Sequence, residues 1–150
     1  MVGRIYHIGL TVSDLDKSIN FYRDVLGLEF QGEVLMVGEE TDKLFNKKNC
    51  QARLAYLNGS KNIEAPPIEL IQFIDNKISK GQPDLFTTSI SEVCFYTDDI
   101  DSIYEHLVKN NVECLSEPQY FDFTSHGFGK SKAFYFKDPD GIILEMMQPL

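Results

Sequence analysis

The feature that most constrains the fold of this chain is an internal repeat. Residues 6–16 read YHIGLTVSDLD, and a degraded copy of this stretch, SEVCFYTDDID, occupies residues 91–101. The two halves also end alike, with IELIQ at residues 68–72 and LEMMQ at residues 144–148. Two copies of about 75 residues are too few and too long for a solenoid. The sequence therefore predicts a duplicated module.

The repeat places potential metal ligands at matching positions in the two halves. His7 aligns with Glu92 on the expected first strand of each half, and Glu69 aligns with Glu145 on the expected last strand. Imidazole and carboxylate groups are both common ligands of divalent metals. The opening stretch and the closing stretch of each half thus carry one potential ligand apiece.

Hydrophobic alternation and turn residues predict a βαβββ order in both halves. In the first half we expect strands at 5–13, 28–37, 53–57 and 66–74, and a helix from Leu15 to Leu26 that Asp14 caps and Gly27 ends. In the second half we expect a helix at 99–110, capped by Asp98 or Asp99, and strands at 90–97, 112–121, 131–137 and 142–148. Residues 38–49 form either a short helix or a flexible flap. The modules span about 1–75 and 89–150, joined by a linker at 76–88.

Side chains alternate across a strand, which sorts the predicted faces. Ile8, Leu10 and Val12 share the face of the first strand that we expect against the helix, and His7 lies on the opposite face. The same rule, with one loop residue added, predicts a substrate pocket lined by Thr11, Ile71, Phe73, Cys94, Tyr96, His126 and Met147. An apolar lining with few polar groups is typical of small-molecule sites, although part of this set is equally consistent with core packing. His126, in a glycine-containing loop, is either an acid/base group or extra ligand, or a surface histidine.

Composition and charge restrict the partners. The net charge is -9 and the pI near 4.7, which disfavours nucleic acid and anionic membrane surfaces. The sequence begins with no signal-peptide pattern and contains no apolar stretch of the 18 or more residues that a membrane span needs. Its three cysteines lack CxxC spacing, as expected for reduced thiols. We therefore expect a cytoplasmic protein whose partner is a small-molecule substrate.

The chain resembles the vicinal oxygen chelate superfamily, which includes glyoxalase I, methylmalonyl-CoA epimerase, extradiol dioxygenases, and fosfomycin- and bleomycin-resistance proteins. The resemblance covers the whole chain and rests on HIGLTV at 7–12, FYRDVLGL at 21–28, IELIQ at 68–72 and FYFKDPDGIILE at 134–145. It implies an α+β fold in which residues 1–150 form one domain. Its two βαβββ modules would form an open, cupped, eight-stranded mixed sheet around a divalent metal. A homodimer is usual in this family.

The resemblance also implies a ligand set of His7, Glu69, Glu92 and Glu145 for Zn, Ni, Co, Mn or Fe. Glu92 is a departure, because many relatives carry a second histidine there. It is a ligand, a general base beside a three-ligand metal, or a solvent-facing residue. Glu145 and Glu92 are the candidate catalytic bases.

The implied chemistry is chelation of two adjacent substrate oxygens, with the ion stabilising an enediolate or oxyanion. A lyase or isomerase is favoured over a dioxygenase. Bacterial glyoxalase I enzymes carry an Arg and an Asn that contact glutathione where this chain has Thr11 and Phe73, so glutathione dependence is not expected. The alternative is a non-catalytic binding protein of the bleomycin-resistance kind.

Overall fold

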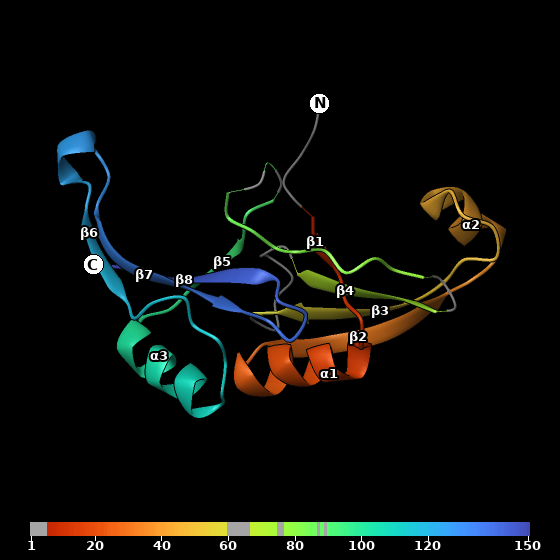
Figure 1. Cartoon of the computed structure of the whole chain (residues 1–150), viewed down its shortest axis with the longest axis horizontal. Helices are drawn as coiled ribbons and strands as arrows, with labels where there is room; N and C mark the ends of the chain where they lie inside the picture. Colours follow the sequence, from red (N-terminus) through yellow and green to blue (C-terminus); the bar gives the residue numbers. More distant parts are fainter. Residues whose placement is uncertain (1–5, 60–66, 75–76, 87, 89) are drawn as a thin grey trace. The chain divides into compact units, whose positions relative to one another are not determined.

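The computed structural model of the chain describes residues 6–59, 67–74, 77–86, 88 and 90–150 (Figure 1). The chain divides into two compact units, Met1–Lys80 and Gly81–Leu150, here called unit 1 and unit 2. No helix in the described part of the chain is long and apolar enough to cross a membrane.

Unit 1 contains a four-stranded sheet and two helices. Its elements are β1 (Ile8–Thr11), α1 (Leu15–Asn20) with its π-helical extension η1 (Phe21–Val25), β2 (Glu29–Met36), α2 (Glu39–Phe45), β3 (Gln51–Asn58) and β4 (Ile68–Ile74). The strand order is β1-β4-β3-β2. The edge strand β1 pairs with β4 in parallel, and the other neighbouring strands pair in antiparallel fashion.

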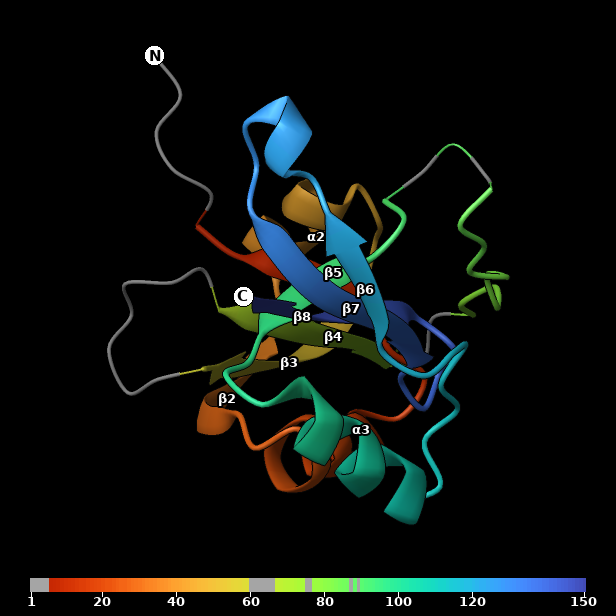
Figure 2. The same cartoon turned by 90° about the vertical axis from the view of Figure 1, so that its left-hand side faces the viewer.

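Unit 2 repeats this topology (Figure 2). Its elements are β5 (Val93–Tyr96), α3 (Ile100–Lys109), β6 (Gln119–Asp122), the short 3-10 helix η2 (Thr124–His126), β7 (Lys130–Lys137) and β8 (Ile143–Pro149). The order is β5-β8-β7-β6, and the edge strand β5 again pairs with β8 in parallel. The predicted βαβββ order is therefore confirmed in both halves, as two four-stranded mixed sheets.

In one segment the structure decides between two open predictions, and in another it differs from the prediction. Residues 38–49, for which a helix and a flap were both open, contain helix α2. The strand expected at 112–121 is found in two pieces, because Cys114 forms an isolated antiparallel bridge with Phe136 and pairing resumes only at β6, residues 119–122. Between the two pieces, Pro118 has no N–H to offer a neighbouring strand.

The helix signals are confirmed. The Asp14 carboxylate accepts from the Lys17 N–H at 3.0 Å, and the Asp99 carboxylate accepts from the Ser102 N–H at 3.1 Å. Asp99, rather than Asp98, is thus the second cap. Gly27 follows the first helix with φ 76°, the left-handed conformation that glycine adopts at a helix end without steric cost.

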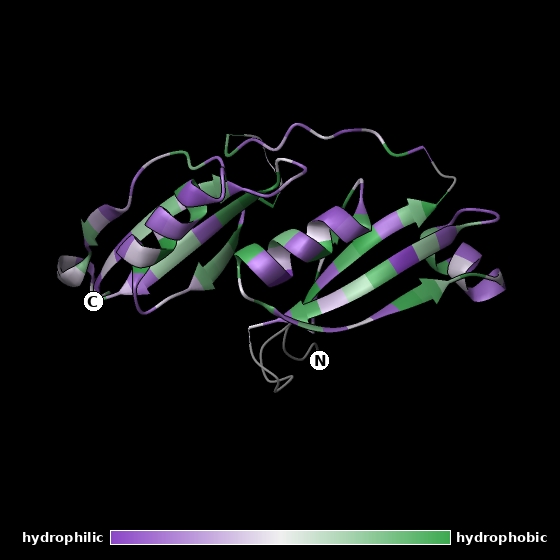
Figure 3. Ribbon diagram, turned by 90° about the horizontal axis from the view of Figure 1, so that it is seen from below, coloured by the Kyte–Doolittle hydropathy of each residue, from purple (hydrophilic) through white to green (hydrophobic). Residues whose placement is uncertain are grey.

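Helix α1 in unit 1 and helix α3 in unit 2 each cover one face of their own sheet and bury the core there. In unit 1 the side chains of Leu10, Val12 and Leu70 are buried on the helix side, as the alternation predicted. Tyr104 of α3 packs edge-on against Phe134 of β7 in unit 2, with 5.4 Å between ring centroids. Hydrophilic and hydrophobic segments alternate along α1 and α3 (Figure 3). Neither α1 nor α3 covers the opposite face of its sheet.

A glutamine attaches the start of the helix to the last strand in each unit. Gln72 donates to the Ser13 carbonyl at 3.1 Å and accepts from the Leu15 N–H at 3.4 Å. Gln148 makes the same two bonds in unit 2, to the Asp98 carbonyl at 2.7 Å and from the Ile100 N–H at 3.1 Å. These bonds explain why the repeated closing motifs both end in glutamine.

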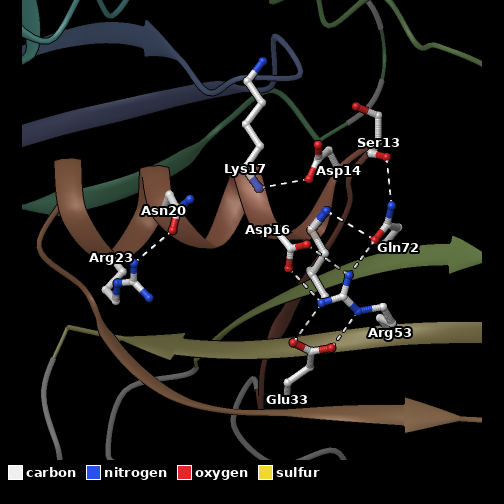
Figure 4. Close-up of polar contacts among 10 residues, drawn as sticks. Ser13, Asp14, Asp16, Lys17, Asn20, Arg23, Glu33, Arg53 and Gln72 are labelled. Atoms are coloured by element: carbon white, nitrogen blue, oxygen red, sulfur yellow. Dashed lines mark hydrogen bonds and ion pairs between the residues drawn. The ribbon is translucent and has the colours of Figure 1, made fainter.

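A cation on the third strand adds a second attachment. Arg53 contacts Asp16 of α1 at 2.8 Å and Glu33 of β2 at 2.7 Å (Figure 4). The corresponding bond in unit 2 joins Lys132 to Asp101 at 2.5 Å. The hydrogen bond from Arg53, with its positive charge, holds the pKa of Asp16 below the ordinary value of 3.8. Both units therefore share the same order of helix and strands and an ion pair between the helix and the third strand.

The Asp16–Arg53 pair gives a test of stability against pH. Because the pKa of Asp16 is lowered on folding, its contribution is fully present above the unfolded pKa and disappears as pH falls through the lowered value. We expect Asp16→Asn to lower the free energy of unfolding at neutral pH and to match the wild type in strong acid. Urea denaturation over this pH range measures the difference. The difference should vanish in an Arg53→Met background, and its persistence there would contradict the assignment to this pair.

Candidate functional site

The candidate site of unit 1 lies on the sheet face opposite α1. The strand register places Gly9, Glu69 and Tyr56 side by side across β1, β4 and β3. Residues directly opposite one another in neighbouring strands project to the same side of a sheet. One row of this face therefore joins a carboxylate, a phenol and a glycine.

Glu69 is the centre of this row. It is only 7% exposed, and buried carboxylates require partners. The Tyr56 hydroxyl donates to Oε1 of Glu69 at 2.7 Å, and Nε2 of His7 lies 3.3 Å from Oε2. A Cβ added at Gly9 would lie 3.5 Å from Oε2, so the glycine leaves space beside that oxygen. One carboxylate oxygen is thus occupied, and the other is directed toward His7.

The spacing of His7 and Glu69 fits two ligands of one ion. Metal–ligand distances of about 2.0–2.2 Å separate adjacent nitrogen and oxygen donors by roughly 3.0–3.4 Å. The observed 3.3 Å falls within that range. Among the described residues no group of three or more His, Cys, Asp or Glu side chains is gathered closely enough to hold a metal. The pair alone is therefore too small a group to form a metal site, and 3.3 Å is also the distance of a His–Glu ion pair.

Burial keeps the phenol of Tyr56 in its donor form. Desolvation, followed by the hydrogen bond to Glu69, raises the pKa of Tyr56 to about 12. The hydroxyl is consequently protonated at neutral pH and can donate to the carboxylate throughout that range.

Unit 2 gathers a corresponding group around Glu145. The register places Cys94 and Tyr135 on either side of Glu145, as Gly9 and Tyr56 flank Glu69. Desolvation, a hydrogen bond to Glu145 and the charges of Glu145 and Glu92 raise the pKa of the Cys94 thiol to about 12. The pKa of Tyr135 is also raised, by burial and by the same two carboxylates. Cys94 is therefore a protonated donor at neutral pH and not a nucleophile.

The two tyrosines were missed by the sequence analysis. Tyr56 lies three residues after Arg53 on β3, and Tyr135 lies three residues after Lys132 on β7. Had the repeat been extended to the third strands using these cations as markers, the tyrosines would have aligned. The signal was present, but single aromatic residues in apolar strands are usually part of the core.

Helix α2 covers part of the same face of unit 1. Phe45 at its C-terminal end packs edge-on against Phe73, with 5.1 Å between ring centroids. Thr11 and Ile71, two further predicted pocket residues, are register partners in the row next to Glu69. The predicted pocket residues of unit 1, Thr11, Ile71 and Phe73, thus lie on one face of the sheet. The Phe45–Phe73 ring pair lies at the end of that face next to α2.

The remaining predicted pocket residues lie in unit 2. Tyr96 and Met147 are register partners next to the row of Cys94 and Glu145. The Tyr96 hydroxyl bonds to Asp98. His126 lies in η2, where a ring nitrogen is 3.0 Å from the Ser125 hydroxyl.

Comparison with known proteins identifies the family. The model of the glyoxalase/bleomycin resistance protein/dioxygenase superfamily matches residues 4–146. The chain belongs to this superfamily. The resemblance inferred from the motifs is thereby confirmed, together with the α+β fold of two βαβββ modules that it implied.

Relatives within the superfamily have different activities. The chain is 31% identical over 146 residues to a metallothiol transferase FosB from Staphylococcus haemolyticus, covering 97% of this chain and 84% of that protein. It is 28% identical over 149 residues to the mitochondrial methylmalonyl-CoA epimerase of Mus musculus, covering 98% and 74%. A glyoxalase family protein from Bacillus cereus superposes with a TM-score of 0.83 at 20% identity, covering 100% and 96%, and this likeness concerns the fold alone.

Proposed function

We propose that this protein is a divalent-metal-dependent, glyoxalase-like enzyme, a lyase or isomerase that acts on a small substrate with two adjacent oxygens. The observation that carries the proposal is the His7–Glu69 pair. Its donor atoms are 3.3 Å apart, and Glu69 is buried on a sheet face that it shares with Tyr56, Thr11 and Ile71. A divalent cation beside Oε2 would compensate the buried carboxylate charge more fully than the neutral Tyr56 hydroxyl does.

The proposed ligands are His7, Glu69, Glu92 and Glu145, the set that the family resemblance implies, and we propose that the protein is a homodimer. One nitrogen and several carboxylate oxygens suit Mn, Fe, Co, Ni or Zn. Such an ion would supply Lewis-acid polarisation of the substrate oxygens. The acidic chain, with no membrane-spanning helix among its described residues, supports a cytoplasmic location.

Glu145 is the proposed general base. It would take the proton from the carbon next to the substrate carbonyl and return it to that carbon or to its neighbour. Cys94 is the register partner of this carboxylate on the neighbouring strand, and its thiol is protonated at neutral pH. Glu92, whose charge also acts on Cys94, is the alternative base.

Two positions argue against a glutathione thioester as the substrate. Thr11 and Phe73 stand where the bacterial glyoxalase I enzymes have cationic and amide side chains. Neither a hydroxyl nor a benzyl ring can pair with a tripeptide carboxylate, and Phe73 is already packed against Phe45. The substrate is therefore expected to be smaller and partly apolar.

A non-catalytic binding protein is the second candidate. The Phe45–Phe73 pair and the carboxylate at Glu92, where many relatives have histidine, favour this alternative. Such a protein would hold an aromatic compound against the apolar face and would not need the donor atoms of His7.

Metal analysis is the first test. Protein purified without chelator should contain about one divalent ion per chain by elemental analysis, or take up one after dialysis against Mn, Co, Ni or Zn. In D2O the loaded protein should exchange the carbon-bound proton of small α-hydroxyketones, measured by NMR, and the chelated protein should not. A protein that takes up none of these ions would overturn the proposal and leave the binding protein.

A further inference from the structure

We infer that Tyr56 is a positioning residue that makes Glu69 a one-oxygen metal ligand. This inference rests on the proposed metal-dependent function. It concerns how the chain orients the Glu69 carboxylate, which is a separate question from which residues bind the metal.

The geometry divides the two oxygens of Glu69 between different partners. Oε1 accepts the hydrogen bond of the Tyr56 hydroxyl at 2.7 Å, while Oε2 faces His7 at 3.3 Å and the space beside Gly9. The Tyr56 bond uses one lone pair of Oε1 and draws charge from that oxygen, which weakens it as a metal donor. Oε2, which faces His7, is therefore the favoured donor to a cation held by His7.

The backbone fixes this arrangement. Tyr56 and Glu69 are direct register partners on the antiparallel strands β3 and β4, so the phenol reaches the carboxylate across one strand spacing. A tyrosine has few rotatable bonds, which makes it a rigid donor. Hydrogen bonds from outside the ligand set commonly set ligand orientation and metal affinity.

The second unit carries a tyrosine at the position that corresponds to Tyr56. Tyr135 is the register partner of Glu145 on β7 and β8, as Tyr56 is of Glu69. The residue at the other side differs, with Gly9 in unit 1 and Cys94 in unit 2. A phenol thus stands beside the glutamate of the last strand in both units, while the residue on the first strand differs.

The test is the variant Tyr56→Phe, which keeps the ring and removes the donor. We expect its affinity for Co²⁺, measured by isothermal titration calorimetry, to fall roughly 10- to 100-fold. The visible absorption spectrum of bound Co²⁺ should also change, because Glu69 can then bind through both oxygens or turn away. The control, Tyr120→Phe, removes a hydroxyl from a side chain that is 54% exposed on β6 and should match the wild type in both measurements.

The outcomes separate this inference from the function on which it rests. A wild type that binds Co²⁺, with Tyr56→Phe unchanged in affinity and spectrum, would overturn the inference and leave the proposed function standing. A lower urea midpoint in Tyr56→Phe at unchanged Co²⁺ affinity would make Tyr56 merely structural, which also overturns it. If the wild type binds neither Co²⁺ nor Mn, Ni or Zn, the proposed function fails, and the role of Tyr56 fails with it.

Discussion

Replacing Glu69 with alanine is expected to abolish stoichiometric metal binding. The substitution removes the donor atom Oε2 and leaves His7 without the partner that lies 3.3 Å from it. Loss of a residue that only supports a ligand costs about 10- to 100-fold in affinity, so the loss of a ligand should exceed roughly 100-fold. The metal-to-protein ratio after dialysis against limiting metal measures the effect, and His7→Ala should behave alike.

The matched control for this prediction is Glu29→Ala. Glu29 is an exposed glutamate on the edge strand β2 of the same unit, so its removal makes the same change in net charge away from the candidate site. It should retain the metal content of the wild type. A Glu69→Ala protein that still carried one ion per chain would refute the assignment of Glu69 as a ligand.

The second large effect concerns stability. Phe136 of β7 is completely buried in unit 2, and its ring centroid lies 5.7 Å from that of Phe134. Truncation of such a ring removes apolar burial and leaves a cavity. We expect Phe136→Ala to lower the free energy of unfolding by about 3–5 kcal/mol. Urea denaturation followed by circular dichroism would show the shift in midpoint.

Phe128→Ala provides the comparison for Phe136→Ala, because it deletes the same atoms from a side chain that is 73% exposed. Surface substitutions of this kind usually change stability by less than about 0.5 kcal/mol. Equal midpoints for the two variants would show that Phe136 does not contribute to a cooperative core.

Much of the fold was predictable because its signals are local. The repeat predicted the duplicated topology, Asp14 and Gly27 marked one helix, and alternation from His7 to Val12 sorted the two faces of β1. Each of these signals depends on residues close together in the sequence. The interruption of the strand before β6 was not predictable in the same way, because the pairing of Cys114 with Phe136 and of β6 with β7 joins segments that are distant in the sequence.

The site was predictable only in part. His7 and Glu69 were identified from the repeat and the resemblance, and the structure brings this pair together. Tyr56 was missed because its role depends on which residue of β4 it faces. That register is set by strand pairing between distant segments, and a shift of one residue would turn the phenol to the other side of the sheet.

The parallel pairing of β1 with β4 has a consequence for the order of folding. His7 and Glu69 are about sixty residues apart in the sequence, and they meet only after the strands and helices between them have been brought into place. Contacts that close so long a loop are entropically costly and tend to form late. A ribosome-bound chain cannot form this pair until β4 has left the exit tunnel. We therefore expect a nascent chain that ends before β4 to lack the ion affinity that we propose for unit 1.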